Sequence, residues 1–484
     1  MINGQLSKRL KLYTSRLLDN LYDCPDVFHQ TSDWPGDFPG RTLLALTSIY
    51  LIYDEGSTER QIIKERLDKF FKHLDMFTNE NHFFGPLFDK RLINEQQLSG
   101  NSWYIRGLCR YYEIFKDNKV LEYLNTIIDS FLLPLSFEYH TYPITSREVE
   151  GGVAGHLLQS KDNKWMLSSD VGCAYLMLDG YVSVYEVTKD QRLKDAIASI
   201  IEQYQKIDYV ALKCQTHATL TCARAILRFY QQTHEEKYLL LAKNIFDKYQ
   251  KVGMTDDYQN LNWFQRPDSW TEPCCVIDSL ILAKHLYLIT KDKHYLVLLN
   301  RIYTNGLRTF QRDNGGAGCT TIQKDGVGQL KMFMYEAYFC CTLREGEGFY
   351  ELSRSIIKDN NLYLLMIPES FEDENIKVVV DLYEDKVIYV EFKKPGEISL
   401  YVPNGFKCQC PVKDNLLTIN SNTDVSFEID IQKVDNRYLY GDMLLSKKKQ
   451  HIDKMYYLNN KEYSYISDSS SFKQDELKDL IQEL

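Results

Sequence analysis

The sequence predicts a mainly α-helical protein with a C-terminal β module, in the form of an (α/α)6 barrel followed by a β-sandwich. Apolar residues recur three and four positions apart from about Gly40 to about Leu352, which indicates amphipathic helices. Short charged turns separate successive helical segments, as in antiparallel helical hairpins. Beyond about Asp359 the pattern changes to short runs of β-branched and aromatic residues, which indicate strands.

The helical region divides into segments of ten to twenty residues. The expected helices are Arg41–Tyr53, Gln61–Phe77, Ser102–Phe115, Val120–Leu133, Val171–Val187, Arg192–Tyr204, Thr216–Gln232, Glu236–Val252, Glu272–Thr290 and Tyr295–Phe310. Helical hairpins in this number suit either an α-solenoid or a closed toroid. The sequence has no fixed-period repeat, and its inter-hairpin loops are uneven and rich in aromatic residues, which favours the toroid. In a toroid the site lies where helix ends converge.

The C-terminal region has short apolar runs separated by turn-forming residues such as Lys394–Glu397 and Pro403–Gly405. The expected strands are Leu362–Ile367, Ile376–Leu382, Lys386–Phe392, Ile398–Val402, Leu416–Ile419 and Val425–Ile431. We therefore expect a barrel domain at 1–355, a β-sandwich at 356–445, and a charged tail at 446–484 that ends in a short helix, Gln474–Leu484. Since β modules of this kind often support dimers, a homodimer is one expected assembly.

The composition argues against several classes of partner. There are 67 acidic and 57 basic residues, a net charge of -10, and no basic cluster long enough to follow a phosphate backbone, so we expect no nucleic acid partner. Met1–Leu18 lacks the apolar core of a secretory signal, and no window has about eighteen consecutive apolar residues, so we expect no membrane span. Twelve scattered cysteines suit a reducing compartment. The expected location is the cytoplasm.

Two pairs of potential metal ligands lie far apart in the sequence. Glu272 and Cys274 are two positions apart at the start of a predicted helix, where free amides and the helix dipole stabilise anions. Cys340 and Cys341 are adjacent, which suits metal binding better than a disulfide between them. Three sulfurs and a carboxylate indicate zinc. The spacing alone leaves open that these cysteines are only small buried apolar residues.

These motifs resemble those of a known family. Glu272-Pro-Cys274, the Cys340-Cys341 pair and the segment Leu299-Asn-Arg-Ile-Tyr-Thr-Asn-Gly306 are similar to the bacterial β-L-arabinofuranosidases of glycoside hydrolase family 127. The resemblance implies an (α/α)6 barrel followed by β-sandwich structure, and a zinc ion held by one glutamate and three cysteines. Carried over, Glu272, Cys274, Cys340 and Cys341 are the ligands, and Cys340 is also the nucleophile that cleaves a carbohydrate substrate.

Other residues are assigned by the same resemblance. Gln215-Thr-His217 is similar to the family segment whose histidine contacts the sugar. The family's acid/base glutamate precedes the Glu272 position by about sixteen residues, which makes Asp256 or Asp257 the candidate here, with a solvated loop pair as the alternative. Asn101 stands in place of a family histidine and Asn300 in place of a family glutamate. We therefore expect a sugar specificity different from that of the family.

Two residues beside the motif are further substrate-binding candidates. Trp263 can stack on a sugar face, although core packing explains an aromatic residue at such a position equally well. Arg266 can contact substrate or fix the loop. Asp170, after Ser168 and Ser169, is expected to cap a helix.

The expected function is a zinc-dependent, retaining glycosidase that acts on a short oligosaccharide or glycoside. A metal-bound thiolate stays ionised at neutral pH and needs no base to attack an anomeric carbon. Two alternatives remain open. One is a barrel glycosidase that works through two carboxylates, and the other is a non-catalytic carbohydrate-binding or scaffold protein with a structural zinc.

Overall fold

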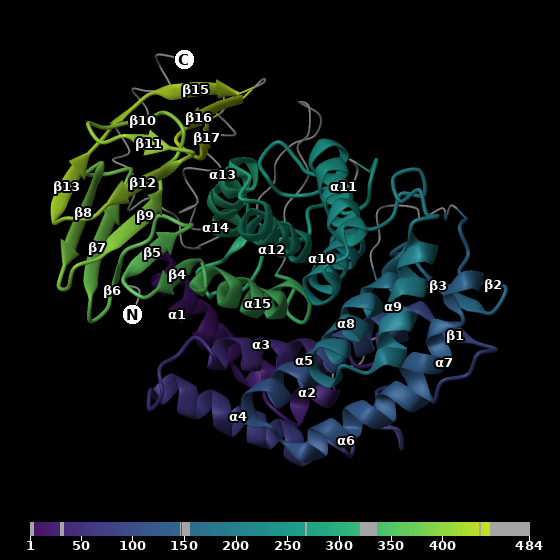
Figure 1. The fold of residues 1–484 in the computed structure, drawn as a ribbon. Coiled ribbons are helices and arrows are strands. Elements are labelled where there is room, and N and C mark those ends of the chain that lie inside the picture. The colour runs from purple at the N-terminus through teal and green to yellow at the C-terminus, as the bar shows by residue number, and fades with distance from the viewer. Residues whose placement is uncertain are drawn as a thin grey trace.

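The computed structural model describes residues 4–29, 33–145, 147, 155–266, 269–319, 336–434 and 437–445. Within these residues, six helices form a closed ring in which each helix contacts the next and the last contacts the first (Figure 1). In ring order these inner helices are α3 (Asp37–Tyr50), α5 (Glu95–Phe115), α8 (Met177–Thr188), α10 (Thr216–Thr233), α12 (Pro273–Thr290) and α15 (Cys341–Ser353). This ring confirms the toroid and excludes the solenoid.

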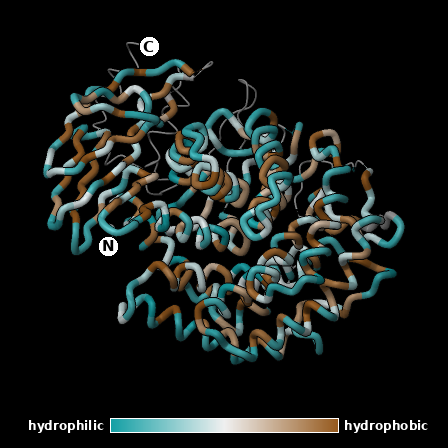
Figure 2. The backbone as a smooth tube through the Cα atoms, in the orientation of Figure 1, coloured by the Kyte–Doolittle hydropathy of each residue, from teal (hydrophilic) through white to brown (hydrophobic). Residues whose placement is uncertain are grey.

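Each inner helix is paired with a helix on the outside of the ring. The outer helices, in the same order, are α4 (Thr58–Leu74), α6 (Asn118–Ile127), α9 (Gln191–Tyr204), α11 (Glu236–Val252), α13 (Lys293–Arg301) and α1 (Gln5–Leu17). The sixth pair therefore joins α15 to the first helix of the chain. Outer helices bury a single stripe, as in α4, where Ile63, Leu67, Phe70 and Leu74 are buried. Figure 2 shows the resulting alternation of hydrophilic and hydrophobic residues along these helices.

Inner helices are buried on nearly every side. In α12 every residue from Pro273 to Lys284 is buried. Two described stretches, Asn118–Thr141 and Pro273–Thr290, are long and apolar enough to cross a membrane by length and composition alone. The second is α12, whose most apolar window is 78% buried in the barrel, so core packing accounts for its composition.

The predicted helices are confirmed, with three changes to their course. The expected helix Val120–Leu133 continues from α6 through a π-helical turn, Ile128–Leu132, into α7 (Leu133–Ser136). The expected helix Tyr295–Phe310 passes through a π-helical turn, Ile302–Leu307, into α14 (Arg308–Phe310). The expected helix Val171–Val187 begins as a 3₁₀ turn, Cys173–Leu176.

Several described elements had not been predicted. In the barrel they are α1, the 3₁₀ turns Asn20–Tyr22 and Tyr139–Thr141, α2 (Asp26–His29), α15, and a small sheet of β1 (Ile93–Asn94), β2 (Leu157–Asp162) and β3 (Trp165–Ser168); several short strands of the β module, described below, were also not predicted. In this sheet β3 pairs in parallel with β1 and antiparallel with β2. Strands this short carry too few residues for a period-two pattern to stand out.

The β module is a two-sheet sandwich, as predicted. One sheet has the order β11-β12-β9-β5-β4, with β5 and β9 parallel, and the other has the order β13-β8-β7-β6. The strands of the first sheet are β4 (Ile356–Asp359), β5 (Leu362–Leu365), β9 (Glu397–Tyr401), β11 (Val412–Lys413) and β12 (Leu416–Ile419); those of the second are β6 (Phe371–Glu372), β7 (Ile376–Asp381), β8 (Val387–Phe392) and β13 (Thr423–Ser426). Apolar side chains from both sheets share one core, for example Leu365 and Leu400 with Val378 and Val390.

Two smaller sheets complete the β module, and the one that contains β17 contacts the barrel. They consist of β10 (Phe406–Lys407) with β14 (Glu428–Ile429), and of β15 (Ile431–Val434), β16 (Arg437–Tyr440) and β17 (Met443–Leu445). The side chain of Asn305 donates to the carbonyl of Asp442 at 2.8 Å and accepts from the amide of Leu444 at 3.0 Å. The predicted tail 446–484, with its helix Gln474–Leu484, lies outside the described residues.

Close packing between α3 and α5 predicts a strong effect of Gly40→Ala. A Cβ atom at Gly40 would lie 2.3 Å from the backbone nitrogen of Tyr104 and 2.8 Å from the carbonyl carbon of Trp103. Because backbone atoms cannot rotate away, the helices must move apart, at a cost of about 1–3 kcal/mol. Gly180→Ala in α8 is the matched control, since its nearest atoms lie 3.3 Å away; we expect a change within about 1 kcal/mol. Urea unfolding measures both, and equal midpoints would contradict the prediction.

Candidate metal centre

The structure brings the four predicted ligands together. The ligand atoms of Glu272, Cys274, Cys340 and Cys341 all lie within 4.8 Å of one another. The Cys274 sulfur is 3.5 Å from each of the other two sulfurs, the adjacent pair is 3.9 Å apart, and the Cys340 sulfur is 3.9 Å from Oε1 of Glu272. This buried group of four residues, hereafter the ligand cluster, can bind a metal ion.

Two neighbouring inner helices position the cluster. Glu272 precedes the first residue of α12, and Pro273 starts that helix, where its fixed φ and missing N–H are tolerated. Cys340 precedes the first residue of α15, and Cys341 is that first residue. Because α12 and α15 are adjacent in the ring, two ligand pairs 66 residues apart meet at the same end of the barrel. Free amides and the positive ends of both helix dipoles stabilise the anionic ligands there.

A cavity of about 380 Å³ opens above the cluster. The inner helices contribute to its wall at or near their N-terminal ends, and loops contribute the rest. The lining includes Trp34, Asp37, Phe38, Arg41, Ser99, Gly155, Asp170, Leu176, Gln215, His217, Asn262, Trp270, Glu272, Cys319, Ala337, Tyr338, Phe339, Cys340 and Cys341. Cys274 and Cys341 are 0% and 1% exposed, whereas Cys340 is partly exposed. Cys340 is therefore the cluster sulfur that a ligand in the cavity reaches most easily.

Arg41 supplies positive charge to the cluster. Its Nη1 donates to the Cys274 sulfur at 3.6 Å, and its Nε donates to both carboxylate oxygens of Asp37 at 2.9 Å. Its guanidinium also lies 4.0 Å from the ring centre of Trp103. Hydrogen bonds with the thiols of Cys274 and Cys341 lower the pKa of Cys340 well below its ordinary value, and the Arg41 charge lowers it further. These contacts favour the thiolate form of Cys340.

His217 connects the cluster to the barrel interior. Its Nδ1 lies 3.2 Å from Oε1 of Glu272, and its Nε2 lies 3.3 Å from Oδ2 of Asp278. Asp278 also accepts hydrogen bonds from Thr221, at 2.8 Å, and from Arg344. Burial alone would raise the pKa of Asp278, but the guanidiniums of Arg344 and other neighbours outweigh it and lower that pKa. The imidazole is therefore fixed between two carboxylates, and it fixes Glu272 in turn.

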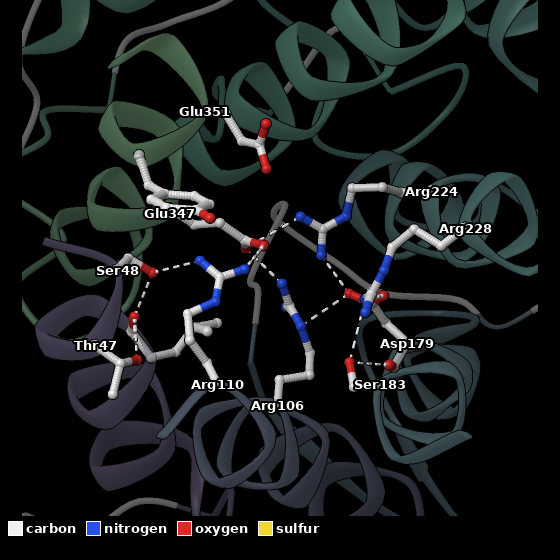
Figure 3. A network of polar contacts seen from close by, with 12 residues as sticks. Thr47, Ser48, Arg106, Arg110, Asp179, Ser183, Arg224, Arg228, Glu347 and Glu351 are labelled. Carbon is white, nitrogen blue, oxygen red and sulfur yellow. Dashed lines mark hydrogen bonds and ion pairs between the residues drawn. The ribbon is translucent and has the colours of Figure 1, made fainter. Parts of the chain in front are cut away.

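Below His217 the barrel axis is filled by a network of buried charges. Figure 3 shows Arg106 and Arg224 between the carboxylates of Asp179 and Glu347, with Arg228 on Asp179. The side chains come from α5, α8, α10 and α15. Burial tends to raise the pKa of both carboxyl groups, yet the surrounding guanidiniums lower the pKa of each well below its usual range. The network supports the site from below and couples the inner helices.

Comparisons with solved structures place the fold. The chain is similar to a family 127 β-L-arabinofuranosidase from Geobacillus stearothermophilus T6, with a TM-score of 0.61 and 12% identity over 92% of this chain and 85% of that one. The chain has the family 127 fold. A second family 127 β-arabinofuranosidase matches with a TM-score of 0.58 and 11% identity, over 90% of this chain and 79% of that chain. A third structure, described as a glycoside hydrolase, matches with a TM-score of 0.59 and 10% identity, over 91% of this chain and 80% of that chain.

No family model and no curated protein matches the chain by sequence. The assignment of the fold therefore rests on the solved structures. The family 127 fold was expected from Glu272-Pro-Cys274 and the Cys340-Cys341 pair. The structural similarity to these proteins, at 10–12% sequence identity, confirms that expectation at the level of the fold.

Within this fold, the predicted substrate residues lie in different places. His217 lines the cavity. Asn101 is buried, accepts from the amide of Phe84 at 2.9 Å and donates to backbone carbonyls. Asn300 donates to the carbonyls of Leu296 and Met366, and it lines a separate cavity against the β module. In the described residues neither asparagine contributes to the wall above the ligand cluster.

The aromatic, basic and acidic candidates near the motif also lie outside that wall. Trp263 is buried and pairs edge-to-face with Trp270, whose side chain does line the cavity. The guanidinium of Arg266 lies 5.7 Å from the ring centre of Trp263. Asp257 is buried and accepts from Thr255 at 2.5 Å and from Gln259 at 3.0 Å. Among the described residues, neither Asp256 nor Asp257 belongs to the cavity lining.

Three functional residues had not been singled out, and one had been assigned a different role. Asp37 and Arg41 share one face of α3, and Asp278 lies one turn after Cys274 in α12, so four-residue spacing is the signal that could have found them. Asp170 was expected to cap a helix. That prediction is wrong, because the 3₁₀ turn begins after Gly172 and has no side-chain cap. Asp170 lines the cavity instead.

Proposed function

We propose that the protein is a zinc-dependent, retaining glycoside hydrolase whose nucleophile is Cys340. The observation that carries the proposal is the position of the ligand cluster at a ligand-sized cavity, with the Cys340 sulfur its most exposed ligand atom. The likeness of the fold to two family 127 arabinofuranosidases supports the reaction class.

The donor set fits zinc. Zinc–sulfur bonds of about 2.3 Å in a tetrahedral site require sulfurs separated by about 3.8 Å. The three sulfur–sulfur distances, 3.5, 3.5 and 3.9 Å, lie near this value. Magnesium and calcium prefer shells of oxygen ligands, so three thiolates disfavour both. Bound by Glu272, Cys274, Cys340 and Cys341, zinc would keep the thiolates ionised at neutral pH.

The reaction then proceeds at Cys340. Its sulfur attacks the anomeric carbon of a sugar in the cavity, and the bond from that carbon to the leaving oxygen breaks. The product is a thioglycosyl intermediate on Cys340. Water resolves this intermediate from the opposite side, and two inversions give net retention. A cavity of about 380 Å³ is at the lower end of the range for small-molecule sites and suits a simple glycoside or the end of a short oligosaccharide.

The cysteines also support a reducing compartment. All twelve are free thiols, including the buried Cys24, Cys109, Cys173 and Cys222, which lie away from the cluster. Because disulfides are rare in the cytosol and thiolate metal sites need reduced cysteines, we propose a cytoplasmic location.

Metal analysis and mass spectrometry test the proposal together. The wild-type protein should contain a single zinc per chain and lose turnover on chelation. Brief incubation with 4-nitrophenyl β-L-arabinofuranoside, within a panel of 4-nitrophenyl pentosides, should place one pentosyl group on Cys340, located by peptide mapping. A metal-free protein, or activity that resists chelation, would instead favour a two-carboxylate glycosidase. Bound zinc without turnover or adduct on the whole panel would favour the binding or scaffold protein.

A further inference from the structure

Asp170 occupies the cavity wall in the segment between β3 and the 3₁₀ turn at Cys173. Its side chain is buried, with 3% of its surface exposed. Oδ2 accepts a hydrogen bond from the amide of Gly155 at 3.0 Å, whereas Oδ1 is buried without a hydrogen-bond partner among the described residues. Since buried polar atoms are almost always paired, an orphaned carboxyl oxygen in a cavity wall indicates a group that awaits a ligand.

The surroundings hold this carboxyl group in one orientation. The backbone amide of Asp170 donates to Oγ of Ser168 at 3.1 Å. Gly155, which donates to Oδ2, is itself fixed, because its carbonyl accepts from Nε1 of Trp34 at 3.1 Å and from Nε2 of Gln96 at 3.2 Å. One oxygen is therefore anchored, and the other has no hydrogen-bond partner among the described residues. A group fixed in this way needs no reorganisation when substrate arrives.

The electrostatic environment favours the protonated form of Asp170. Among the described residues no lysine or arginine forms an ion pair with it. Burial is the main cause that raises the pKa of Asp170 well above its ordinary value. A carboxyl group that carries a proton at neutral pH can donate it to a leaving oxygen.

Neighbouring wall residues carry further orphaned polar atoms. Both amide atoms of Asn262, Oε1 of Gln215 and Oγ of Ser99 are buried without hydrogen-bond partners in the described part of the chain, and all three residues line the same cavity. Gln215 is held by Glu272, to which its Nε2 donates at 3.2 Å. A cluster of unpaired donors and acceptors of this kind matches the hydroxyl groups of a sugar.

We propose that Asp170 is the general acid and base of the glycosidase, a role that rests on the proposed function. In the first half-reaction the Asp170 carboxyl group gives its proton to the departing oxygen while the Cys340 sulfur bonds to the anomeric carbon. In the second half-reaction the Asp170 carboxylate takes a proton from water, the water oxygen bonds to the anomeric carbon, and the carbon–sulfur bond breaks to restore the thiolate. Each catalytic cycle returns the proton to Asp170.

The test compares Asp170→Asn with wild type on two leaving groups. A 4-nitrophenyl glycoside leaves without protonation, whereas a methyl glycoside of the same sugar needs an acid. We expect kcat/KM for the methyl glycoside to fall by about 10²–10⁴-fold, and that for the nitrophenyl glycoside to change by less than about 10-fold. Because the variant lacks the base, the Cys340 adduct should accumulate in intact-mass spectra. Added azide should release it as a glycosyl azide of retained configuration.

Two further variants separate the possible failures. Asp442→Asn removes another buried carboxyl group, far from the cavity in the β module, and should match wild type on both substrates. If Asp170→Asn lowered kcat/KM equally for both substrates, the role of Asp170 alone would be overturned. The same would follow if Asp257→Asn, rather than Asp170→Asn, showed the leaving-group dependence and the azide rescue. A wild-type protein that neither cleaves the panel nor forms an adduct on Cys340 would overturn the proposed function and this role with it. Melting temperature and zinc content confirm that each variant is folded.

Discussion

Cys340→Ser is expected to lower the turnover of any glycoside that the wild-type protein cleaves by about 10⁴-fold or more. A serine hydroxyl of the same shape has a far higher pKa than a thiol, so the metal and Arg41 cannot keep it ionised. It is also a poor ligand for zinc, and the metal content should fall. Intact-mass spectra should show no sugar adduct. Steady-state kinetics, metal analysis and mass spectrometry on one preparation check all three results.

Cys275→Ser is the matched control for this variant. Cys275 is as buried as Cys274, which it follows directly, but its thiol donates to the Tyr249 hydroxyl at 3.6 Å and it does not belong to the ligand cluster. This variant should keep its zinc and most of its activity. If Cys340→Ser also retained wild-type turnover, the cysteines would be structural and the chemistry would belong to two carboxylates.

Asp179→Asn is expected to destabilise the protein by about 3–5 kcal/mol. Asp179 accepts from Arg106 at 2.9 Å, from Arg228 at 2.6 Å and from Arg224, and its side chain is fully buried. The amide that replaces it has the same shape but no charge, so the guanidiniums of Arg106, Arg224 and Arg228 each lose one carboxylate partner. Chemical unfolding measures the loss. Asp129→Asn is the control, because its ion pair with Arg192 is exposed; we expect about 0–1 kcal/mol.

The same network predicts how stability depends on pH. The pKa of Asp179 and that of Glu347 are lowered in the folded protein, where guanidiniums outweigh the effect of burial. In the unfolded chain both groups titrate near about pH 4. Their stabilisation is therefore present above that pH and is lost as the pH falls through the lowered values. The free energy of unfolding, measured by chemical denaturation between about pH 7 and about pH 3, should fall with pH. The fall should be smaller for Asp179→Asn than for the wild type.

Most of the fold could be predicted from periodicity, because long helices and alternating strands bury regular sets of apolar residues. The helical segments from α3 to α13 and the strands β5, β7, β8, β9 and β12 follow from this signal. It does not predict β4, β6 or β11, and the expected strand Val425–Ile431 is divided among β13, β14 and the start of β15. Helix α1 has the same kind of apolar stripe, with Leu6, Tyr13 and Leu17 buried, but its pairing with α15 at the far end of the barrel sequence could not be predicted from local pattern. The π-helical turns at Ile128–Leu132 and Ile302–Leu307 likewise reflect packing rather than local sequence.

The ligand cluster could be predicted, because its members form two tight pairs of distinctive chemistry. The acid could not. Asp170 is 102 residues before Glu272 in the chain, and nothing in Ser168-Ser169-Asp170 separates a helix cap from a carboxyl group in a cavity wall. Motif spacing pointed instead to Asp256 and Asp257. Only the three-dimensional path of the loop after β3 shows that Asp170, rather than Asp256 or Asp257, lines the cavity at the ligand cluster.

The pairing of α1 with α15 has a consequence for biosynthesis. The Tyr13 hydroxyl donates to the carbonyl of Leu343 across 330 residues of sequence, and Arg16 pairs with Glu336 at 2.9 Å. At ribosomal rates of about 5–20 residues per second, the N-terminal helix waits on the order of half a minute for its partner. Cys340 and Cys341 emerge with that partner. Ring closure and completion of the ligand cluster are therefore one late event, so a nascent chain released early would expose both an unpaired helix and an unfinished metal site.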